Sequence, residues 1–255
     1  MLLNLNHMKD LSLNEIVNQY PGSRHVFETF RFDYCCGGKQ TLEHACSKRS
    51  IPVEEVVAAI AKRADQKDDI IDFTHWPLDL LIDYIEKKHH RYVVENLELI
   101  TQKIERLIHR HGPENPYLLD LQRMFHETAV NLSQHMKKEE LILFPHIRKL
   151  VACEMNLMPY EPAGFGSVEN PIAIMETEHS SEGERFESIA ELTNNYTPPA
   201  HACATWQFTY EKLSEFEKDL HRHIHLENNL LFPHAILLEA QLKANAQAGI
   251  AIPQA

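Results

Sequence analysis

Two segments of this chain repeat one pattern of residues. Residues 135–146 read HMKKEELILFPH, and residues 223–234 read HIHLENNLLFPH. Each segment begins with His-x-x-x-Glu and ends with Phe-Pro-His, with the same spacing between Glu and Pro. Positions i and i+4 of a helix lie on one face, about 6 Å apart along the axis. Two copies of this imidazole–carboxylate pair predict a duplicated helical unit that directs metal-binding side chains to one place.

The composition favours an all-α fold. Only eight glycines occur in 255 residues, and Leu, Ile, Glu and Lys dominate long stretches, as in helical proteins. No stretch approaches the roughly 20 apolar residues of a membrane span. The first residues, MLLNLNHMKDLSL, lack the basic and apolar regions of a signal peptide, so we expect a cytoplasmic protein without membrane contact.

Charge and the counts of two residue types narrow the function further. The net charge of −12 argues against nucleic-acid binding, because phosphates repel an acidic chain. Histidine occurs 17 times, which fits a site for transition metals. Five cysteines in a cytoplasmic chain are expected to be reduced, and an odd count argues against a disulfide framework.

The first part of the chain, residues 1–68, reads as a small helical domain. Ser12 and Glu15 form a capping box that starts one helix. Further helical stretches are expected at about 23–34, at 42–46 and directly after Ser50, where Pro and two Glu occupy the first turn. The polar residues 66–69 are the expected linker to a second domain.

Four longer helices are expected between residues 77 and 244. Their approximate ranges are 77–111, 115–151, 171–194 and 201–244. A long Gly- and Pro-containing connection joins the second to the third, so two helical hairpins form a four-helix bundle with one crossover. Pro145 and Pro233 lie inside helical stretches, and each is expected to bend or interrupt its helix just past the metal-binding turn.

The first and third helices should complete the metal site. The third contains METEH, ending at His179, and the first contains the pair His89-His90. His179 precedes His223 by 44 residues, whereas His90 and His89 precede His135 by 45 and 46. The apolar residues that follow at matching positions favour His90, with His89 as the alternative.

The candidate ligand set is therefore four histidines and two glutamates: His90, His135, His179, His223, Glu139 and Glu227. If both glutamates bridge, each of two ions receives two imidazoles and two carboxylate oxygens and keeps open positions. Such ligation suits iron best, with manganese or zinc as alternatives. Burying unpaired carboxylates is costly, so the metal-free protein is expected to be less stable.

Other polar residues near these positions are expected to play lesser roles. Three glutamates next to the ligands should lie outside the ion's immediate contacts or in solvent: Glu140, Glu176 and Glu178. Four histidines are expected to lie outside the ligand set: His146, His234, His221 and His225.

Several segments together resemble one known family. They are FDYCCGGKQTLEHAC, the histidine pair at 89–90, SQHMKKEELILFP, METEH and HIHLENNLLFP. In this order they resemble the repair-of-iron-centres family, the YtfE/ScdA type of hemerythrin-like di-iron protein. Some members have Tyr-His-Asp where this chain has His89-His90-Arg91, which favours His90 as the ligand.

The resemblance implies a domain organisation and a function. It implies an ScdA_N-like Cys-Cys domain over residues 1–68 and a hemerythrin-like bundle over 77–244 that holds a non-haem, oxo-bridged di-iron centre on the six candidate ligands. It further implies repair of iron–sulfur proteins damaged by nitric oxide or peroxide, with iron donation as one route, and a homodimer. Two alternatives stay open: a nitric oxide or peroxide reductase, and an iron- or redox-dependent sensor.

The adjacent cysteines Cys35 and Cys36 are the remaining candidate functional residues. Neighbouring cysteines can simply pack in a core, and a disulfide between them is strained. The family resemblance favours a chemical role, in which a thiolate passes electrons, binds iron transiently or reacts with nitrosative species. The other three cysteines are expected to be structural: Cys46, Cys153 and Cys203.

Overall fold

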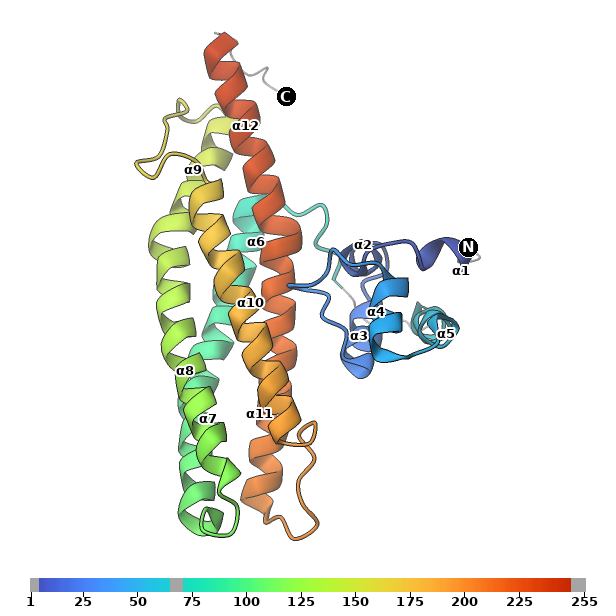
Figure 1. Ribbon diagram of the computed structural model, residues 1–255. Coiled ribbons are helices and arrows are strands. Elements are labelled where there is room, and N and C mark those ends of the chain that lie inside the picture. The colour runs from blue at the N-terminus through green and yellow to red at the C-terminus, as the bar shows by residue number, and fades with distance from the viewer. Residues whose placement is uncertain (1–4, 65–70, 249–255) are drawn as a thin grey trace.

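The computed structural model describes residues 5–64 and 71–248, and its elements over these ranges are helices. Five short helices form a small unit that packs against one side of a long bundle, about midway along its length (Figure 1). The prediction of an all-α fold with a four-helix bundle is confirmed.

The small N-terminal unit has its own apolar core. Its helices are α1 (Leu5–Met8), α2 (Leu13–Gln19), α3 (Ser23–Phe30), α4 (Leu42–Arg49) and α5 (Val53–Ala64). Leu13, Phe27 and Leu42 are completely buried within it. The Glu15 carboxylate accepts a hydrogen bond of 2.8 Å from the Ser12 N–H, as expected of the capping box.

Helix α3 ends at Phe30, four residues earlier than the predicted range. Arg31 adopts a left-handed conformation with φ 56°, and the Phe32 N–H then donates to the Phe27 carbonyl over 2.8 Å. This turn carries Phe32 back into the core of the unit. Glycine usually marks such a helix end, and Arg31 provides no such signal in the sequence.

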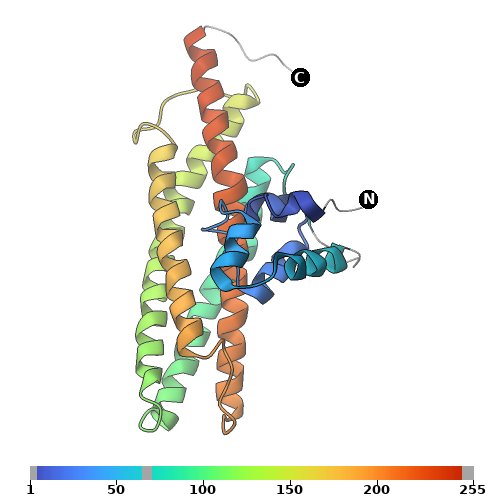
Figure 2. The same ribbon diagram turned by 45° about the vertical axis from the view of Figure 1, so that its right-hand side comes forward.

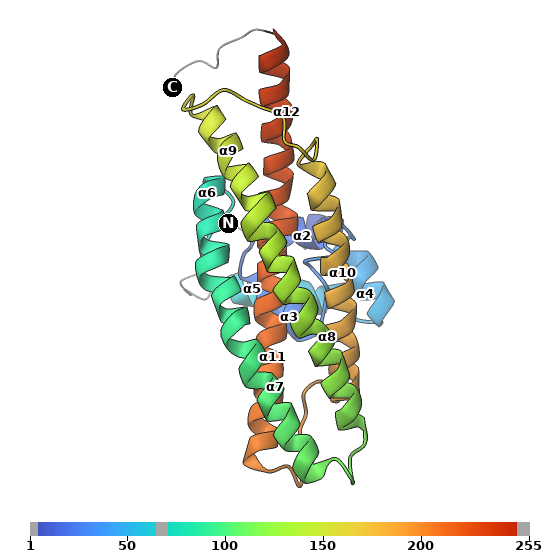
Figure 3. The ribbon, with the colours of Figure 1, turned by 90° about the vertical axis from the view of Figure 1, so that its left-hand side faces the viewer.

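Four long helical rods form the bundle, and three of them are composite (Figure 3). The first comprises α6 (Leu78–Tyr84), η1 (Ile85–His90) and α7 (Arg91–His111); the second α8 (Tyr117–Lys138), η2 (Glu139–Leu143) and α9 (Phe144–Glu154); the third α10 (Glu169–Leu192); and the fourth α11 (Ala204–Leu226), η3 (Glu227–Leu231) and α12 (Phe232–Ala248).

The elements η1, η2 and η3 are single π-helical turns inside otherwise α-helical rods. In η2 the Phe144 N–H donates to the Glu139 carbonyl five residues back, and in η3 Phe232 donates to Glu227 in the same way. A proline in an α-helix lacks an N–H and clashes with the carbonyl four residues earlier. The wider turn before Pro145 and Pro233 relieves that clash, so each rod continues without the predicted interruption. The π turn begins at Glu139 in one rod and at Glu227 in the other.

A polar layer divides the bundle core into two apolar compartments. One compartment contains Leu81, Phe144, Met175 and Phe232, and the other contains Ile100, Phe125, Phe186 and Phe216. Each compartment draws residues from all four rods. The buried histidines and glutamates of the predicted site occupy the positions between them.

The N-terminal unit contacts the fourth rod (Figure 2). Arg31 pairs with Glu217 at 2.9 Å, and Arg222 pairs with Glu28 at 3.2 Å. Cys35, on the loop after α3, belongs to the apolar core of the bundle. The small unit and the bundle therefore share one packed interface.

Over the described ranges, no helix combines the length and apolar character needed to cross a membrane.

Candidate metal centre

Six side chains from the four rods converge in the polar layer. Their relative exposure lies between 0% and 3%, and they are His90, His135, Glu139, His179, His223 and Glu227. Three of them lie at the junctions between α-helix and π turn: His90 ends η1, and Glu139 and Glu227 begin η2 and η3. The structure thus brings together all six predicted ligands. His90 belongs to this set, and His89 does not.

The six side chains form two donor groups that share both glutamates. One group contains His90 and His223, the other His135 and His179, and Glu139 and Glu227 belong to both. The two oxygens of each carboxylate lie against histidines of different donor groups. Glu139 presents Oε2 to His90 Nε2 at 3.4 Å and Oε1 to His135 Nε2 at 3.3 Å.

Glu227 divides its oxygens in the same way. Its Oε1 lies 2.9 Å from His223 Nε2, and its Oε2 lies 3.3 Å from His179 Nε2. Each carboxylate therefore directs one oxygen to each donor group, as a bridge between two ions requires.

The donor spacing fits cations. The Nε2 atoms of His90 and His223 are 3.2 Å apart, and those of His135 and His179 are 2.9 Å apart. Two ligand atoms about 2.1 Å from one ion, at right angles to each other, are separated by about 3 Å. Both oxygens of Glu139 and Oε2 of Glu227 are buried without a hydrogen-bond donor among the described residues. Cations would satisfy these orphaned oxygens.

The pKa values of the buried histidines and glutamates also fit a cation site. Burial opposes protonation of His90 and His135, but Glu139 outweighs it and raises the pKa of each to about 9. Burial and the charge of Glu227 act to raise the pKa of Glu139, yet His135 and His90 hold it below its ordinary value. Without metal, protonated imidazoles therefore balance the glutamates at neutral pH. A metal ion must displace those protons when it binds.

The outward-facing nitrogens of three histidines have hydrogen-bond partners. His90 Nδ1 lies 2.7 Å from Glu140 Oε1, and His135 Nδ1 lies 2.7 Å from Glu178 Oε2. With Nε2 directed at the centre, each Nδ1–H donates to its carboxylate. Such partners fix the orientation and tautomer of a ligand histidine.

Asn228 is the partner that sequence reasoning missed. Its Oδ1 lies 2.7 Å from His179 Nδ1. Asn228 directly follows Glu227, as Glu140 directly follows Glu139, so the internal repeat contained the signal. His223 is the exception, because its buried Nδ1 has no partner among the described residues.

His89 and Glu176 lie outside both donor groups. The His89 ring stacks on His223 with centroids 5.6 Å apart, and its Nδ1 lies 3.1 Å from Asp219 Oδ2. The Glu176 side chain makes no hydrogen bond or ion pair with a described residue, whereas Glu140 and Glu178 contact the candidate ligands His90 and His135 directly.

The other predicted outsiders lie away from the donor groups as well. His146 is buried against Glu239 at 3.4 Å, and His234 is exposed. His221 and His225 both contact the ring of Tyr34.

Cys35 and Cys36 lie on a tight loop next to the bundle. Asp33 accepts backbone hydrogen bonds from Cys35, Cys36 and Gly37, and the two sulfur atoms are 3.7 Å apart. A hydrogen bond with Cys36, and then burial, raise the pKa of the Cys35 thiol well above its ordinary value. Asn228 Nδ2 donates to the Cys35 carbonyl over 3.4 Å, so one side chain joins this loop to the candidate ligand His179.

The remaining three cysteines are free thiols: Cys46, Cys153 and Cys203. Cys46 and Cys153 lie in the apolar cores, as expected of structural residues.

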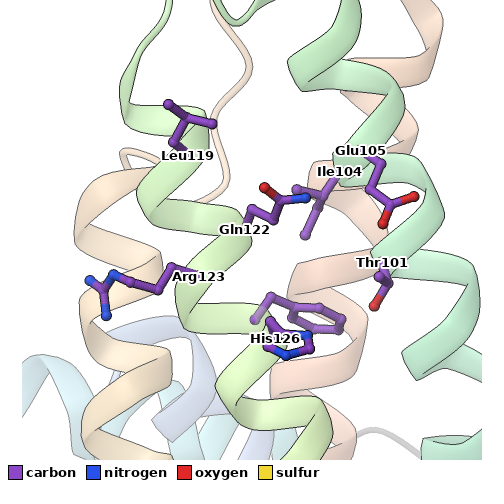
Figure 4. Close-up of a pocket in the computed structure, with 8 residues that line it drawn as sticks. Thr101, Ile104, Glu105, Leu119, Gln122, Arg123 and His126 are labelled. Atoms are coloured by element: carbon purple, nitrogen blue, oxygen red, sulfur yellow. The ribbon is translucent and has the colours of Figure 1, made fainter.

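Two cavities lie outside the candidate metal centre, and one of them is lined by a cysteine. One of about 710 Å³ lies between the N-terminal unit and the bundle and is lined by Cys36, Arg31 and His221 among others. Another of about 260 Å³ lies between α7 and α8, where Thr101 and Glu105 face Gln122 and His126 (Figure 4). The cavity in Figure 4 contains none of the metal-binding groups found among the described residues.

Comparison with known proteins identifies both parts of the chain. Residues 81–235 match the hemerythrin HHE cation binding domain, and residues 9–64 match a domain of unknown function called ScdA_N. The chain is 38% identical over 238 residues to the iron–sulfur cluster repair protein YtfE of Musicola paradisiaca, covering 92% of this chain and 100% of the relative.

Two further relatives have the same printed name. The YtfE protein of Pectobacterium atrosepticum is 39% identical over 234 residues, and that of an Escherichia coli strain is 41% identical over 233 residues. Each match covers 89% of this chain and 97% of the relative. The similarity therefore extends over both the N-terminal unit and the bundle.

Proposed function

Because this chain belongs to the YtfE family of iron–sulfur cluster repair proteins and carries its hemerythrin HHE domain, we propose that it repairs iron–sulfur clusters damaged by nitrosative or oxidative stress. In this proposal the protein supplies iron from a labile, non-haem, oxo-bridged di-iron centre. Its partners are damaged iron–sulfur proteins in the cytoplasm, and the protein acts as a homodimer.

One observation carries the proposal: two buried glutamates direct one oxygen each to two separate pairs of histidines. A donor set of four imidazoles and two carboxylates suits iron, and it leaves coordination positions that the protein does not fill. Iron held there would supply exchangeable metal and open positions for small oxidants.

The protein's own residues perform three tasks in this proposal. Glu139 and Glu227 hold the two ions together and compensate their charge. The four histidines complete the donor set, and Glu140, Glu178 and Asn228 orient three of them through Nδ1. The apolar compartments above and below the polar layer exclude bulk water from the carboxylates.

Cys35 and Cys36 are proposed to serve the same repair process. Cys36 lines the large cavity between the N-terminal unit and the bundle, whereas Cys35 is buried and its raised pKa keeps it a neutral thiol. This division assigns the accessible chemistry to Cys36 and makes Cys35 its hydrogen-bonding neighbour. Thiolate character and access together determine thiol reactivity.

The test is recovery of a peroxide-damaged iron–sulfur enzyme with the iron-loaded protein. We expect the double variant His135→Ala/Glu139→Ala to bring recovery down to the rate without added protein. His234→Ala is the matched control. His234 is an exposed histidine at the end of the second copy of the repeat, and it lies outside both donor groups. Recovery at an unchanged rate with the double variant contradicts the proposal.

A nitric oxide or peroxide reductase is the second candidate, favoured by the positions that the six protein donors leave open on two ions. It predicts many turnovers of nitric oxide or peroxide per protein in the presence of a reductant. Consumption limited to the amount of iron present excludes it and leaves the repair proposal intact.

A further inference from the structure

The two metal positions have unequal surroundings, although the bundle that holds them is internally repeated. Ligand histidines need a second partner at the outer nitrogen, and removal of such a partner typically lowers metal affinity by about 10–100-fold. At the His135–His179 position both histidines have one. At the His90–His223 position only His90 does, because no described residue accepts a hydrogen bond from His223 Nδ1.

The sequence explains the difference. The residue before the ligand histidine is Glu178 in one half and His89 in the other. Glu178 accepts a hydrogen bond from His135, but His89 stacks its ring against His223 and turns its Nδ1 to Asp219. Replacement of a carboxylate by an imidazole at this repeat position leaves His223 without an acceptor.

The partners themselves are also held to different degrees. At the His135–His179 position, Glu178 pairs with Lys138, and Asn228 donates to the Cys35 carbonyl. At the other position, Glu140 pairs with His90 and makes no second ion pair with a described residue. The hydrogen-bond partners at the His135–His179 position therefore have polar contacts of their own, whereas Glu140 at the other position has none besides His90 among the described residues.

A cavity lies next to the His90–His223 position. His89, which stacks on His223, also lines a cavity of about 140 Å³ between the N-terminal unit and the bundle. The His89 ring therefore contacts both this cavity and the candidate ligand whose Nδ1 has no partner among the described residues.

From these contacts we infer that the His90–His223 position releases its ion first and is the donating half of the centre, while the His135–His179 position retains its ion. This inference rests on the proposed function for its two ions and for the use of the released one. It adds which residues hold the exchangeable ion and why.

Chelator competition tests the order of release. The full-length protein is loaded with Fe(II) without oxygen, its iron content is measured, and a chromogenic Fe(II) chelator is added in excess. We expect two phases of equal amplitude, with rates that differ by about tenfold or more. A single phase overturns the inference.

Two matched variants assign the phases. Glu140→Ala removes the partner of His90, and Glu178→Ala removes the partner of His135. We expect Glu140→Ala to accelerate only the fast phase and Glu178→Ala to accelerate only the slow phase, each by about 10–100-fold. The Gln variants keep an acceptor and should recover part of each loss. The opposite assignment contradicts the inference.

Anomalous diffraction then locates the retained ion after one equivalent has been removed. An ion between His135 and His179 supports the inference, and an ion between His90 and His223 refutes it. If the purified protein retains only one ion, the position of that ion supports or refutes the inference in the same way. Failure of the repair assay with normal two-phase release would instead reject the proposed function and leave the order of release established.

Discussion

At the scale of single residues, Glu139 and Glu227 have surroundings that suit bound cations. Both are fully buried, and three of their four oxygens have no hydrogen-bond donor among the described residues. An uncharged amide of the same size cannot bridge two ions. We expect Glu139→Gln to lower bound iron from about two ions per chain to one or fewer, as measured by elemental analysis.

Glu140→Gln is the control for that measurement. Glu140 lies next in sequence but contacts only the outer nitrogen of His90. It should retain two ions after gentle purification. Equal iron contents in Glu139→Gln and the unmodified protein would show that Glu139 is not a ligand.

Glu239 gives a residue-scale prediction that depends on pH. Burial acts to raise its pKa, but hydrogen bonds from Lys243, Ser167 and the Val168 N–H outweigh it and lower the pKa below the ordinary value of 4.5. A depressed folded-state pKa contributes stability above the unfolded pKa, and that stability is lost as pH falls through the folded pKa.

We therefore expect Glu239→Gln to lower the free energy of unfolding by about 1–3 kcal/mol at pH 7. The difference from the unmodified protein should shrink as pH falls below about 4.5. Urea denaturation of the metal-free protein at several pH values measures it, with Glu154→Gln, at an exposed site, as control. If the difference in the free energy of unfolding stays constant down to pH 3, the charge of Glu239 is not the source of the stabilisation.

The residues of the candidate centre were predictable to the extent that the internal repeat contained them. The repeat placed His135, Glu139, His223 and Glu227 on matching helical faces, and spacing added His179 and favoured His90. The stacking of His89 on His223 and the link from Asn228 to Cys35 were not predictable, because they join segments far apart in sequence. Such contacts depend on how the rods and the N-terminal unit pack, which local patterns do not encode.

At the scale of elements, we expect the π turns to set the direction of the two glutamate side chains. η2 and η3 begin at Glu139 and Glu227, and each is followed within two residues by a proline. The sequence signalled the prolines but not the wider turn, because an α-helix interrupted by a kink has the same pattern. The four-helix arrangement itself was predictable from the helix-favouring composition and from the Gly- and Pro-containing connections between the helical stretches.

Replacement of Pro145 tests this role of the π turn. Pro145→Ala restores an N–H and removes the clash, which favours a regular α-helix by about 3 kcal/mol at that position. The candidate ligand Glu139 would then rotate relative to α9. We expect an equal or higher melting temperature without metal, and a metal affinity lower by about tenfold, as chelator titration measures.

Pro171→Ala is the control, since Pro171 occupies the first turn of α10, where proline is tolerated. An unchanged metal affinity in Pro145→Ala would show that packing, rather than the proline, maintains η2.

At the scale of the whole molecule, we expect metal binding in the polar layer to stabilise the fold. Any ligand that binds only the folded state adds about 2.7 kcal/mol at one hundred times its Kd. For two ions in a protein of this size, that corresponds to a rise of about 10–20 °C in Tm. Calorimetry with and without a chelator measures it.

Glu139→Ala provides the contrast, because a chain that cannot bridge the ions should melt at nearly the same temperature under both conditions. Identical Tm values for the unmodified protein with and without metal would argue against a buried centre.

The division of the bundle core has a consequence for local opening. Each apolar compartment is closed by all four rods, and the polar layer separates the two apolar cores. When the ions leave, that layer offers charges and imidazoles instead of apolar contact, so either end of the bundle can open while the other stays closed. Backbone amides at the two ends would then exchange their hydrogens with solvent independently. The bound ions would thus make one cooperative folding unit out of two.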